Sequence, residues 1–291
     1  MIRPTAGERL FDIGNVVFML LLMFVTLYPF WYVLVASISE PGYIAATRGA
    51  IWWPHGFNLG SYKAVFHNPV IQTGYLNTLF VVVVGTALNI LMTSLGAYVL
   101  SRQNVMLKNA IMFMIVFTMF FGGGLIPNYI LVTSLGMLDS LWALIIPVAV
   151  SSFNLIIMRT AFQAVPVSLE ESARLDGAND FTILFRVVLP LSLPVVAVMI
   201  LFYGVAHWNS WFGALIYMRD RTHYPLQLIL REILISNSTD SMTVDSGGDK
   251  LQVALTIKYA TIIVATGPIL ILYPYLQKFF VKGVMIGAIK E

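Results

Sequence analysis

The sequence contains no cysteine, and only 11% of its 291 residues are charged. The lack of cysteine excludes a disulfide framework, a thiolate metal site and a cysteine nucleophile. Soluble domains carry about 25% charged residues, whereas this chain is 58% hydrophobic and has a mean hydropathy of +0.83. A soluble fold of this length could not bury so much apolar surface, but a lipid bilayer can cover it. The composition therefore predicts an integral membrane protein.

Several signatures of chemistry are also missing. No Gly-Lys dipeptide occurs, so the chain lacks the phosphate loop Gly-x-x-x-x-Gly-Lys-Ser/Thr that binds ATP in many proteins. The four histidines lack a metal-ligand spacing such as His-Glu-x-x-His, so we expect no metal site. The net charge of +3 is not gathered into a basic cluster, which argues against a nucleic-acid partner. No catalytic constellation converges within the apolar runs, so we expect no enzyme.

Six runs free of Asp, Glu, Lys and Arg are each long enough to hold one membrane span, which takes about 20 apolar residues. They cover residues 13–39, 64–101, 109–138, 140–158, 187–218 and 259–277. The second helix is expected to begin near Thr73, because the residues from His67 to Pro69 are typical of a loop. Backbone groups in lipid must bond within their own segment, so each run predicts a helix. We expect an all-α polytopic protein with about six transmembrane helices in one domain, residues 1–291.

Lysines and arginines near the helix ends set the orientation, because cytoplasmic loops carry an excess of them. With the N-terminus inside, ten of the 17 lysines and arginines face the cytoplasm and seven lie outside. We therefore expect both termini in the cytoplasm. The expected cytoplasmic segments are 1–12, 165–188 and 278–291, and the expected outer loops are 40–72 and 219–252. Within the second outer loop, the polar stretch 237–250 is expected to be mobile.

The segment 165–188 is the most charged part of the chain, and its pattern predicts two short helices that meet at an angle. Ser168 followed by Glu171 fits a capping box, and Gly177 can adopt the left-handed conformation that ends a helix. Asn179 or Asp180 can cap the second helix. One apolar stripe is expected on that helix, formed by Phe181, Leu184, Phe185 and Val188. The prediction is a rigid elbow that stands off the membrane and runs into the fifth span at Pro190.

The residues Glu171 to Ala178 read Glu-Ser-Ala-Arg-Leu-Asp-Gly-Ala and are followed by Leu189-Pro190. This pattern resembles the EAA motif of binding-protein-dependent ABC importer permeases, with Ser172 where the family usually has alanine. The resemblance implies a type I ABC importer permease fold in which the elbow is the coupling helix, with Glu171 paired to a basic residue of a separate ATPase. The implied ATPase-coupling residues are Glu170, Glu171, Ser172, Ala173, Asp176, Gly177, Ala178, Leu189 and Pro190.

The segments 207–211 and 283–290 also resemble carbohydrate permeases of the maltose-permease type. The residues Phe121 to Pro127, and Tyr224 to Gln227 with Arg231-Glu232, resemble a subgroup that handles oligosaccharides, including uronate-containing ones such as alginate fragments. The resemblance implies a multi-pass subunit of the bacterial cytoplasmic (inner) membrane. Implied partners are a second, different permease chain, an external solute-binding protein, and two ATPase subunits that hold ATP and Mg; no cofactor is expected in this chain.

Two alternatives to a carbohydrate permease stay open. One is an importer permease for another small polar solute, and the other is a secondary transporter or channel subunit. A secondary transporter would need acidic or basic groups within its spans for ion coupling, and the runs hold almost none away from their ends.

Polar and aromatic side chains within the spans mark a substrate pathway, because polar groups are costly in lipid unless they line a cavity. The candidates are Asn154 in the fourth span and Tyr203, His207, Asn209 and Trp211 in the fifth. Sugars offer hydroxyls to amides and apolar faces to aromatic rings. The alternative is that the asparagines bond between helices, while His207 and Trp211 belong to the interfacial aromatic belt.

Other polar and aromatic residues receive a structural interpretation. Asn77 and Asn89 in the second span are expected to bond between helices. Trp52 and Trp53 are expected either to anchor the first outer loop at the membrane interface or to form a docking surface for an outside partner.

Overall fold

The computed structural model describes residues 5–47, 49–236 and 250–288 of the chain. They fall into two compact units, Met1–Asn68 with Glu232–Thr266 and Pro69–Arg231 with Gly267–Glu291. Every regular element among the described residues is helical. Three helices are long and apolar enough to cross a membrane, and three bent helix pairs raise the number to six. The predicted all-α fold with about six spans is therefore confirmed.

The first unit begins with the long helix α1 (Ala6–Ile38), which starts well before the first predicted run. Thr5 caps it, and Glu8 completes a capping box with the Thr5 backbone. The short helices α2 (Pro41–Ala46) and α3 (Gly60–His67) follow within the predicted outer loop. A small buried cluster joins the end of α1 to this loop and consists of Val35, Ala36, Ile44 and Ile51.

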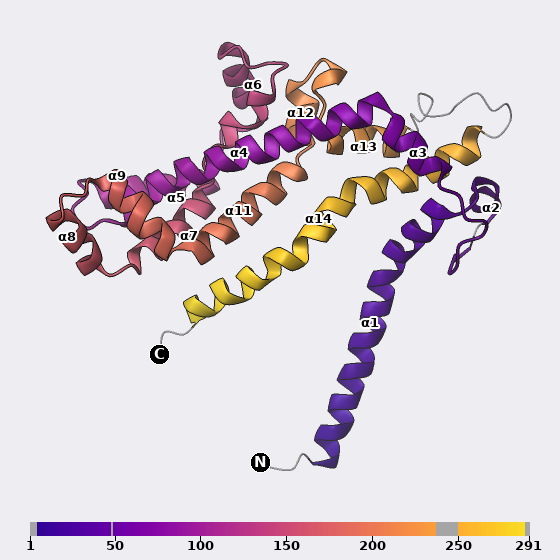
Figure 1. Cartoon of the computed structure of the whole chain (residues 1–291), viewed down its shortest axis with the longest axis horizontal. Coiled ribbons are helices and arrows are strands. Elements are labelled where there is room, and N and C mark those ends of the chain that lie inside the picture. Colours follow the sequence, from indigo (N-terminus) through magenta and orange to yellow (C-terminus); the bar gives the residue numbers. More distant parts are fainter. Residues whose placement is uncertain (1–4, 48, 237–249, 289–291) are drawn as a thin grey trace. The chain divides into compact units, whose positions relative to one another are not determined.

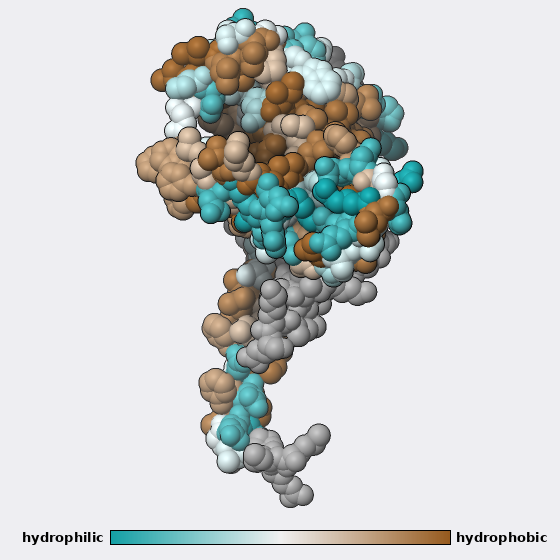
Figure 2. Space-filling view, turned by 90° about the vertical axis from the view of Figure 1, so that its left-hand side faces the viewer, coloured by the Kyte–Doolittle hydropathy of each residue, from teal (hydrophilic) through white to brown (hydrophobic). Residues whose placement is uncertain are grey.

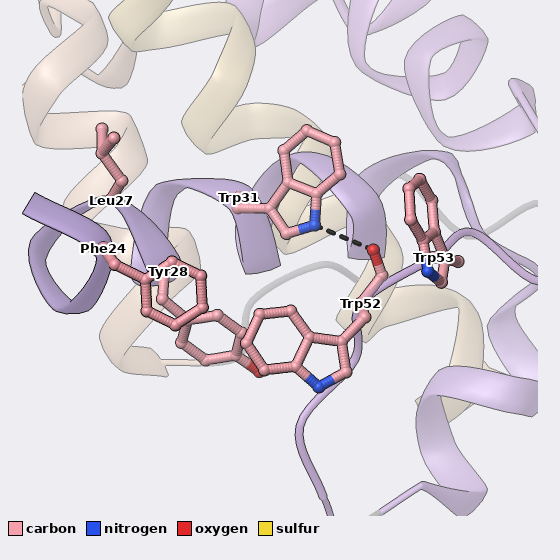
Figure 3. Close-up of a pocket in the computed structure, with 6 residues that line it drawn as sticks. All are labelled: Phe24, Leu27, Tyr28, Trp31, Trp52 and Trp53. Atoms are coloured by element: carbon pink, nitrogen blue, oxygen red, sulfur yellow. Dashed lines mark hydrogen bonds between the residues drawn. The ribbon is translucent and has the colours of Figure 1, made fainter. Parts of the chain in front are cut away.

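An aromatic groove of about 410 Å³ lies where the loop after α2 crosses α1. Its lining residues are Phe24, Leu27, Tyr28, Trp31, Trp52 and Trp53 (Figure 3). The Trp31 indole donates to the Trp52 carbonyl oxygen at 2.8 Å, and the Tyr28 hydroxyl accepts the Ile51 N–H at 3.1 Å. Trp52 also stacks on Phe24. These contacts fix Trp52 against α1, a candidate membrane span, while Trp53 meets the Trp31 ring edge-on and stays exposed. This arrangement favours an interfacial anchor.

The second unit is built around α4 (Pro69–Ser101), which packs along α7 (Ser152–Gln163) and α11 (Leu193–Trp208) (Figure 1). The helix begins at Pro69 and not near Thr73, because proline suits the first helical position, where no N–H is needed. The core between these helices holds Tyr98, Met158, Phe162, Met199 and Tyr203, all buried.

Three of the six spans are broken. The third consists of α5 (Lys108–Phe120) and α6 (Leu125–Ser134), bent by 113°. The residues between them include Gly124, whose φ of +83° few other residues adopt, so the glycine run breaks this span. In the fourth span, the 3₁₀ turns η1 (Leu141–Leu144) and η2 (Ile146–Val148) meet α7 at 51°.

The C-terminal part contains α12 (Phe212–Tyr217), the 3₁₀ turn η4 (Arg221–His223) and α13 (Leu226–Ser236). The last helix, α14 (Lys250–Ala288), continues beyond the predicted end of the sixth run at Gln277. The stretch that the sequence predicts to be mobile lies outside the described residues except for Lys250.

Candidate functional site

The predicted elbow consists of α8 (Val167–Leu175), a tight turn and α9 (Asp180–Ile183). Gly177 has a φ of +82°, its N–H bonds to the Arg174 carbonyl, and the Ala178 N–H bonds to the Ala173 carbonyl. This pair of hydrogen bonds is the Schellman motif, which ends a helix at a left-handed residue. The predicted role of Gly177 in the backbone is confirmed.

The first helix of the elbow starts differently from the prediction. Pro166 is the N-cap, no side chain caps the helix, and Ser168 lies inside its first turn. The predicted capping box of Ser168 and Glu171 is therefore wrong. The prediction failed because Pro166 fixes its own φ and lets the helix begin before Ser168. Within the helix, the Ser172 hydroxyl donates to the Ser168 carbonyl at 2.9 Å.

The second helix has its predicted cap but a different periodicity. Asn179 Oδ1 accepts the Thr182 N–H at 2.8 Å. After α9 the chain makes a π turn, η3 (Leu184–Val188), and a short helix, α10 (Leu189–Leu191), before an 88° bend into α11. The wider π turn changes the angle between successive side chains. The predicted single stripe is therefore wrong: Leu184 and Val188 are buried, whereas Phe181 and Phe185 are exposed.

The implied coupling residues separate into an exposed and a buried group. Glu171, Ser172, Asp176, Gly177 and Pro190 are exposed, and the neighbouring Leu175 is 89% exposed. Figure 2 looks onto this end of the second unit and shows hydrophilic side chains gathered at the height of α8 and α9. Ala173, Ala178 and Leu189 pack against the buried core instead. The elbow thus presents polar side chains, together with the exposed Leu175, on a packed base.

Glu170 belongs to the buried group. It is only 4% exposed, and its carboxylate forms an ion pair with the Arg102 guanidinium, just beyond the end of α4. Arg102 also donates to the Phe162 carbonyl at 3.3 Å and lies over the Tyr98 ring. Arg102 is one of the ten lysines and arginines that are expected to face the cytoplasm, and its position in the sequence gives no other sign of a role. The two partners are 68 positions apart, and nothing in the sequence pattern links them.

A polar cluster within the bundle accounts for two of the substrate-pathway candidates. Asn89 is fully buried on α4, donates to the carbonyls of Val148 (2.7 Å) and Ala149 (2.9 Å), and bonds to His207 Nε2 at 2.7 Å. Asn89 therefore bonds between segments as predicted. His207 is itself buried, so its ring faces α4.

Tyr203 precedes His207 by one turn of α11, and its hydroxyl belongs to the same cluster. It bonds to Thr93 Oγ1 at 2.7 Å and accepts the Ser151 N–H at 3.0 Å. Thr86 lies in the same region and has a buried hydroxyl without a hydrogen-bond partner among the described residues. The cluster ties α4, the bend of the fourth span and α11 together.

Of the three other pathway candidates, Asn154 borders this cluster, because its N–H bonds to Ser151 Oγ at 3.4 Å, and the other two lie apart from it. Asn154 is buried on α7. Asn209 is exposed at the end of α11 and donates to the Val205 carbonyl of its own helix. Trp211 is half-buried, and the Arg231 guanidinium lies 4.5 Å from its ring centroid. The structure thus places an amide, an aromatic face and a cation near one helix break.

A clasp at the opposite end of α4 from the elbow is formed by Asp139 and the segment 219–223. Asp139 has a φ of +59°, and its Oδ1 accepts the N–H groups of Arg219 and Asp220, both at 2.9 Å. The hydrogen bonds from Asp220 and then Arg219 lower the pKa of Asp139 to about 2. Asn77 bonds the carbonyls of Thr222 and Tyr224, which confirms its predicted role between segments.

The described residues hold no group of three or more His, Asp or Glu side chains that could bind a metal ion. Up to six candidate spans, with two short helices joined by an exposed turn before the fifth, fit a component of a membrane transport system. Comparison with known families agrees: residues 93–286 match the family described as "Binding-protein-dependent transport system inner membrane component", and the chain belongs to it.

Two relatives from Bacillus subtilis (strain 168) are similar over almost their whole length. The "Polygalacturonan/rhamnogalacturonan transport system permease protein YtcP" is 43% identical over 97% of this chain and 99% of its own. "Protein LplC" is 40% identical over 98% and 97%. A chain of a bacterial ABC transporter involved in the import of the acidic polysaccharide alginate has the same fold, with a TM-score of 0.88, 31% identity, and coverage of 96% of this chain and 100% of that one.

Proposed function

We propose that this chain is the permease subunit through which an ATP-driven importer passes an oligosaccharide into the cytoplasm. The observation that carries the proposal is the elbow: its EAA-like residues form an exposed knob on a packed base. The chain lacks a phosphate loop, so the energy must come from a separate ATPase that grips this knob. Closure of two such ATPases would draw two elbows together and switch the pathway between inward- and outward-facing states.

The proposed assembly contains a second, different permease chain, two ATPases holding ATP and Mg, and an external solute-binding protein. The elbow and both termini lie in the cytoplasm in this proposal, and the Asp139 clasp lies outside. The clasp then fixes the shape of the outer surface on which the binding protein docks, since one carboxylate orders the whole segment 219–223.

The proposed substrate is an oligosaccharide with carboxylated sugar units. One relative named above is called a polygalacturonan/rhamnogalacturonan permease, and the alginate that the similar transporter helps to import is described as an acidic polysaccharide. Arg231 supports this class: the described residues place no carboxylate within ion-pair distance of it, and its guanidinium covers the Trp211 ring. An arginine can pair with a uronate carboxylate, while a tryptophan stacks on a sugar face. We propose that Asn209, Trp211 and Arg231 contact the substrate, and that Asn154, Tyr203 and His207 hold the pathway wall behind them.

Binding of the ATPase to the elbow is tested by purifying the complex from cells that express this chain together with the transporter genes next to its own gene. Leu175→Asp places a charge on the most exposed apolar side chain of the elbow, and we expect the ATPase to be lost while the permease stays in the membrane. Met106→Asp is the matched control, because Met106 is 83% exposed on the loop after α4 and lies outside the elbow. Failure of any phosphate-loop ATPase to copurify with the unchanged chain would refute the proposed function.

The substrate class is tested with the binding protein and the assembled transporter in liposomes. Oligogalacturonides should stimulate ATP hydrolysis and enter the vesicles, and Arg231→Gln should reduce their uptake more than that of a neutral oligosaccharide. Stimulation by maltodextrins or amino acids alone would instead support an importer for another polar solute. Uptake driven by an ion gradient without ATP would support a secondary transporter.

A further inference from the structure

The buried ion pair of Arg102 and Glu170 has no role in the function proposed so far. Helix α8 has only nine residues, and a helix this short is unstable unless other parts of the protein hold it. Its exposed residues are those expected to meet the ATPase, so something else must fix its position. Glu170 is the only buried residue of α8.

One guanidinium joins three helices at this point. Arg102 Nη1 pairs with Glu170 of α8, Nη2 donates to the Phe162 carbonyl of α7, and Nε donates to Ser101 at the end of α4. Lys108 donates to the Arg102 carbonyl at 2.8 Å and fixes the backbone from the other side. The N–H groups of the Arg102 guanidinium are thus directed to three different helices. Because the guanidinium is planar and rigid, these contacts fix the helices relative to one another more firmly than one flexible contact would.

A second ion pair in the elbow offers an internal comparison. Arg174 and Asp180 lie 2.5 Å apart and link α8 to α9, but their side chains are 55% and 64% exposed. The side chains of Arg102 and Glu170 are 18% and 6% exposed. Exposed pairs contribute little to stability because water screens them, whereas losing one partner of a buried pair leaves an uncompensated charge. The buried pair is therefore the stronger of the two ionic links that hold α8 in place.

We propose that Arg102 and Glu170 are positioning residues that fix the coupling helix to the end of α4, so that a displacement imposed on α8 reaches α4 directly. The proposal rests on the proposed function for its coupling role. It separates the two adjacent glutamates: Glu170 acts within this chain, and Glu171 remains available to the ATPase. It also adds Arg102, which lies outside the EAA-like segment, to the coupling machinery.

The position of α8 can be measured without any substrate. The chain has no cysteine, so Leu175→Cys gives a unique site for a spin label on the exposed face of the elbow. Glu170→Gln should increase the mobility of this label in the purified permease, and Asp180→Asn, which breaks the exposed pair, should not. The charge reversals Arg102→Glu and Glu170→Arg should each increase label mobility, and the double reversal should restore it.

Coupling is measured in the complete transporter with binding protein, ATP and oligogalacturonides. Each single reversal should lower the number of sugars imported per ATP hydrolysed by about tenfold, the scale on which residues linking two sites alter their coupling. The double reversal should recover most of this ratio. Unchanged label mobility in both single variants, or an unchanged transport ratio, would overturn the inference. If the unchanged transporter imports no oligogalacturonide, the proposed substrate fails, while the label still tests the ion pair.

Discussion

Asn89 is the residue at which the cost of losing one side chain in this bundle can be worked out most directly. Its amide makes three hydrogen bonds, to the carbonyls of Val148 and Ala149 and to His207 Nε2, and it is fully buried. Asn89→Leu keeps the shape but leaves these groups without their partner. Hydrogen bonds between membrane helices contribute about 0.6 kcal/mol on average and at most about 1.7 kcal/mol, so loss of the three should lower the unfolding free energy by roughly 2 kcal/mol and by no more than about 5 kcal/mol.

The assay is unfolding of the purified permease in mixed micelles with increasing SDS, followed by tryptophan fluorescence. Thr160→Val is the matched control, because Thr160 is exposed and its hydroxyl bonds only within its own helix. A double-mutant cycle of Asn89→Ala with His207→Ala should show that the two losses are not additive. If Asn89→Leu and the control differ by less than about 0.5 kcal/mol, the polar cluster does not hold α4 to its neighbours.

Three further predictions concern other positions. Gly177→Val should leave the chain inserted in the membrane but uncouple ATP hydrolysis from uptake. The added Cβ would have no atom within 4 Å, so the cost is in the backbone, where a β-branched residue in the left-handed conformation costs about 1–2 kcal/mol. Full uptake in liposomes would contradict this prediction. Gly85→Ala should destabilise the permease in the SDS assay, because its Cβ would lie 2.7 Å from His207 Nε2, whereas Gly204→Ala, with 3.8 Å of room, should not. In the folded protein the pKa of Asp139 is about 2, whereas a free aspartate has a pKa of about 4. The ionised Asp139 should therefore contribute its full stabilisation above about pH 4, and this contribution should disappear as the pH falls towards 2. Melting of Asp139→Asn between pH 6 and 2.5 should lack this step, and an identical step in both proteins would exclude the clasp as its source.

The sequence predicts local features here better than it predicts long-range pairing. Gly177 and Asn179 act through the backbone within a few residues of themselves, so their roles follow from residue type and spacing. The capping box failed because Pro166 offered an earlier start, and the apolar stripe failed because a π turn replaced the expected period. Arg102 and Glu170 could not have been paired from the sequence, because their contact exists only once α4, α7 and α8 have packed together.

The position of α4 explains why contacts at its middle and at its end can act together. The third, fourth and fifth spans are each broken, and α1 and α14 contain internal prolines. Helix α4 has its only proline at its first position and no break. Asn89 and Arg102 are thirteen positions apart in the sequence, about 20 Å along a helix. A continuous helix is stiff over this length. A displacement of α8 that moves Arg102 should therefore also strain the hydrogen bonds of Asn89, which hold the bend of the fourth span. Loss of either contact should therefore impair coupling.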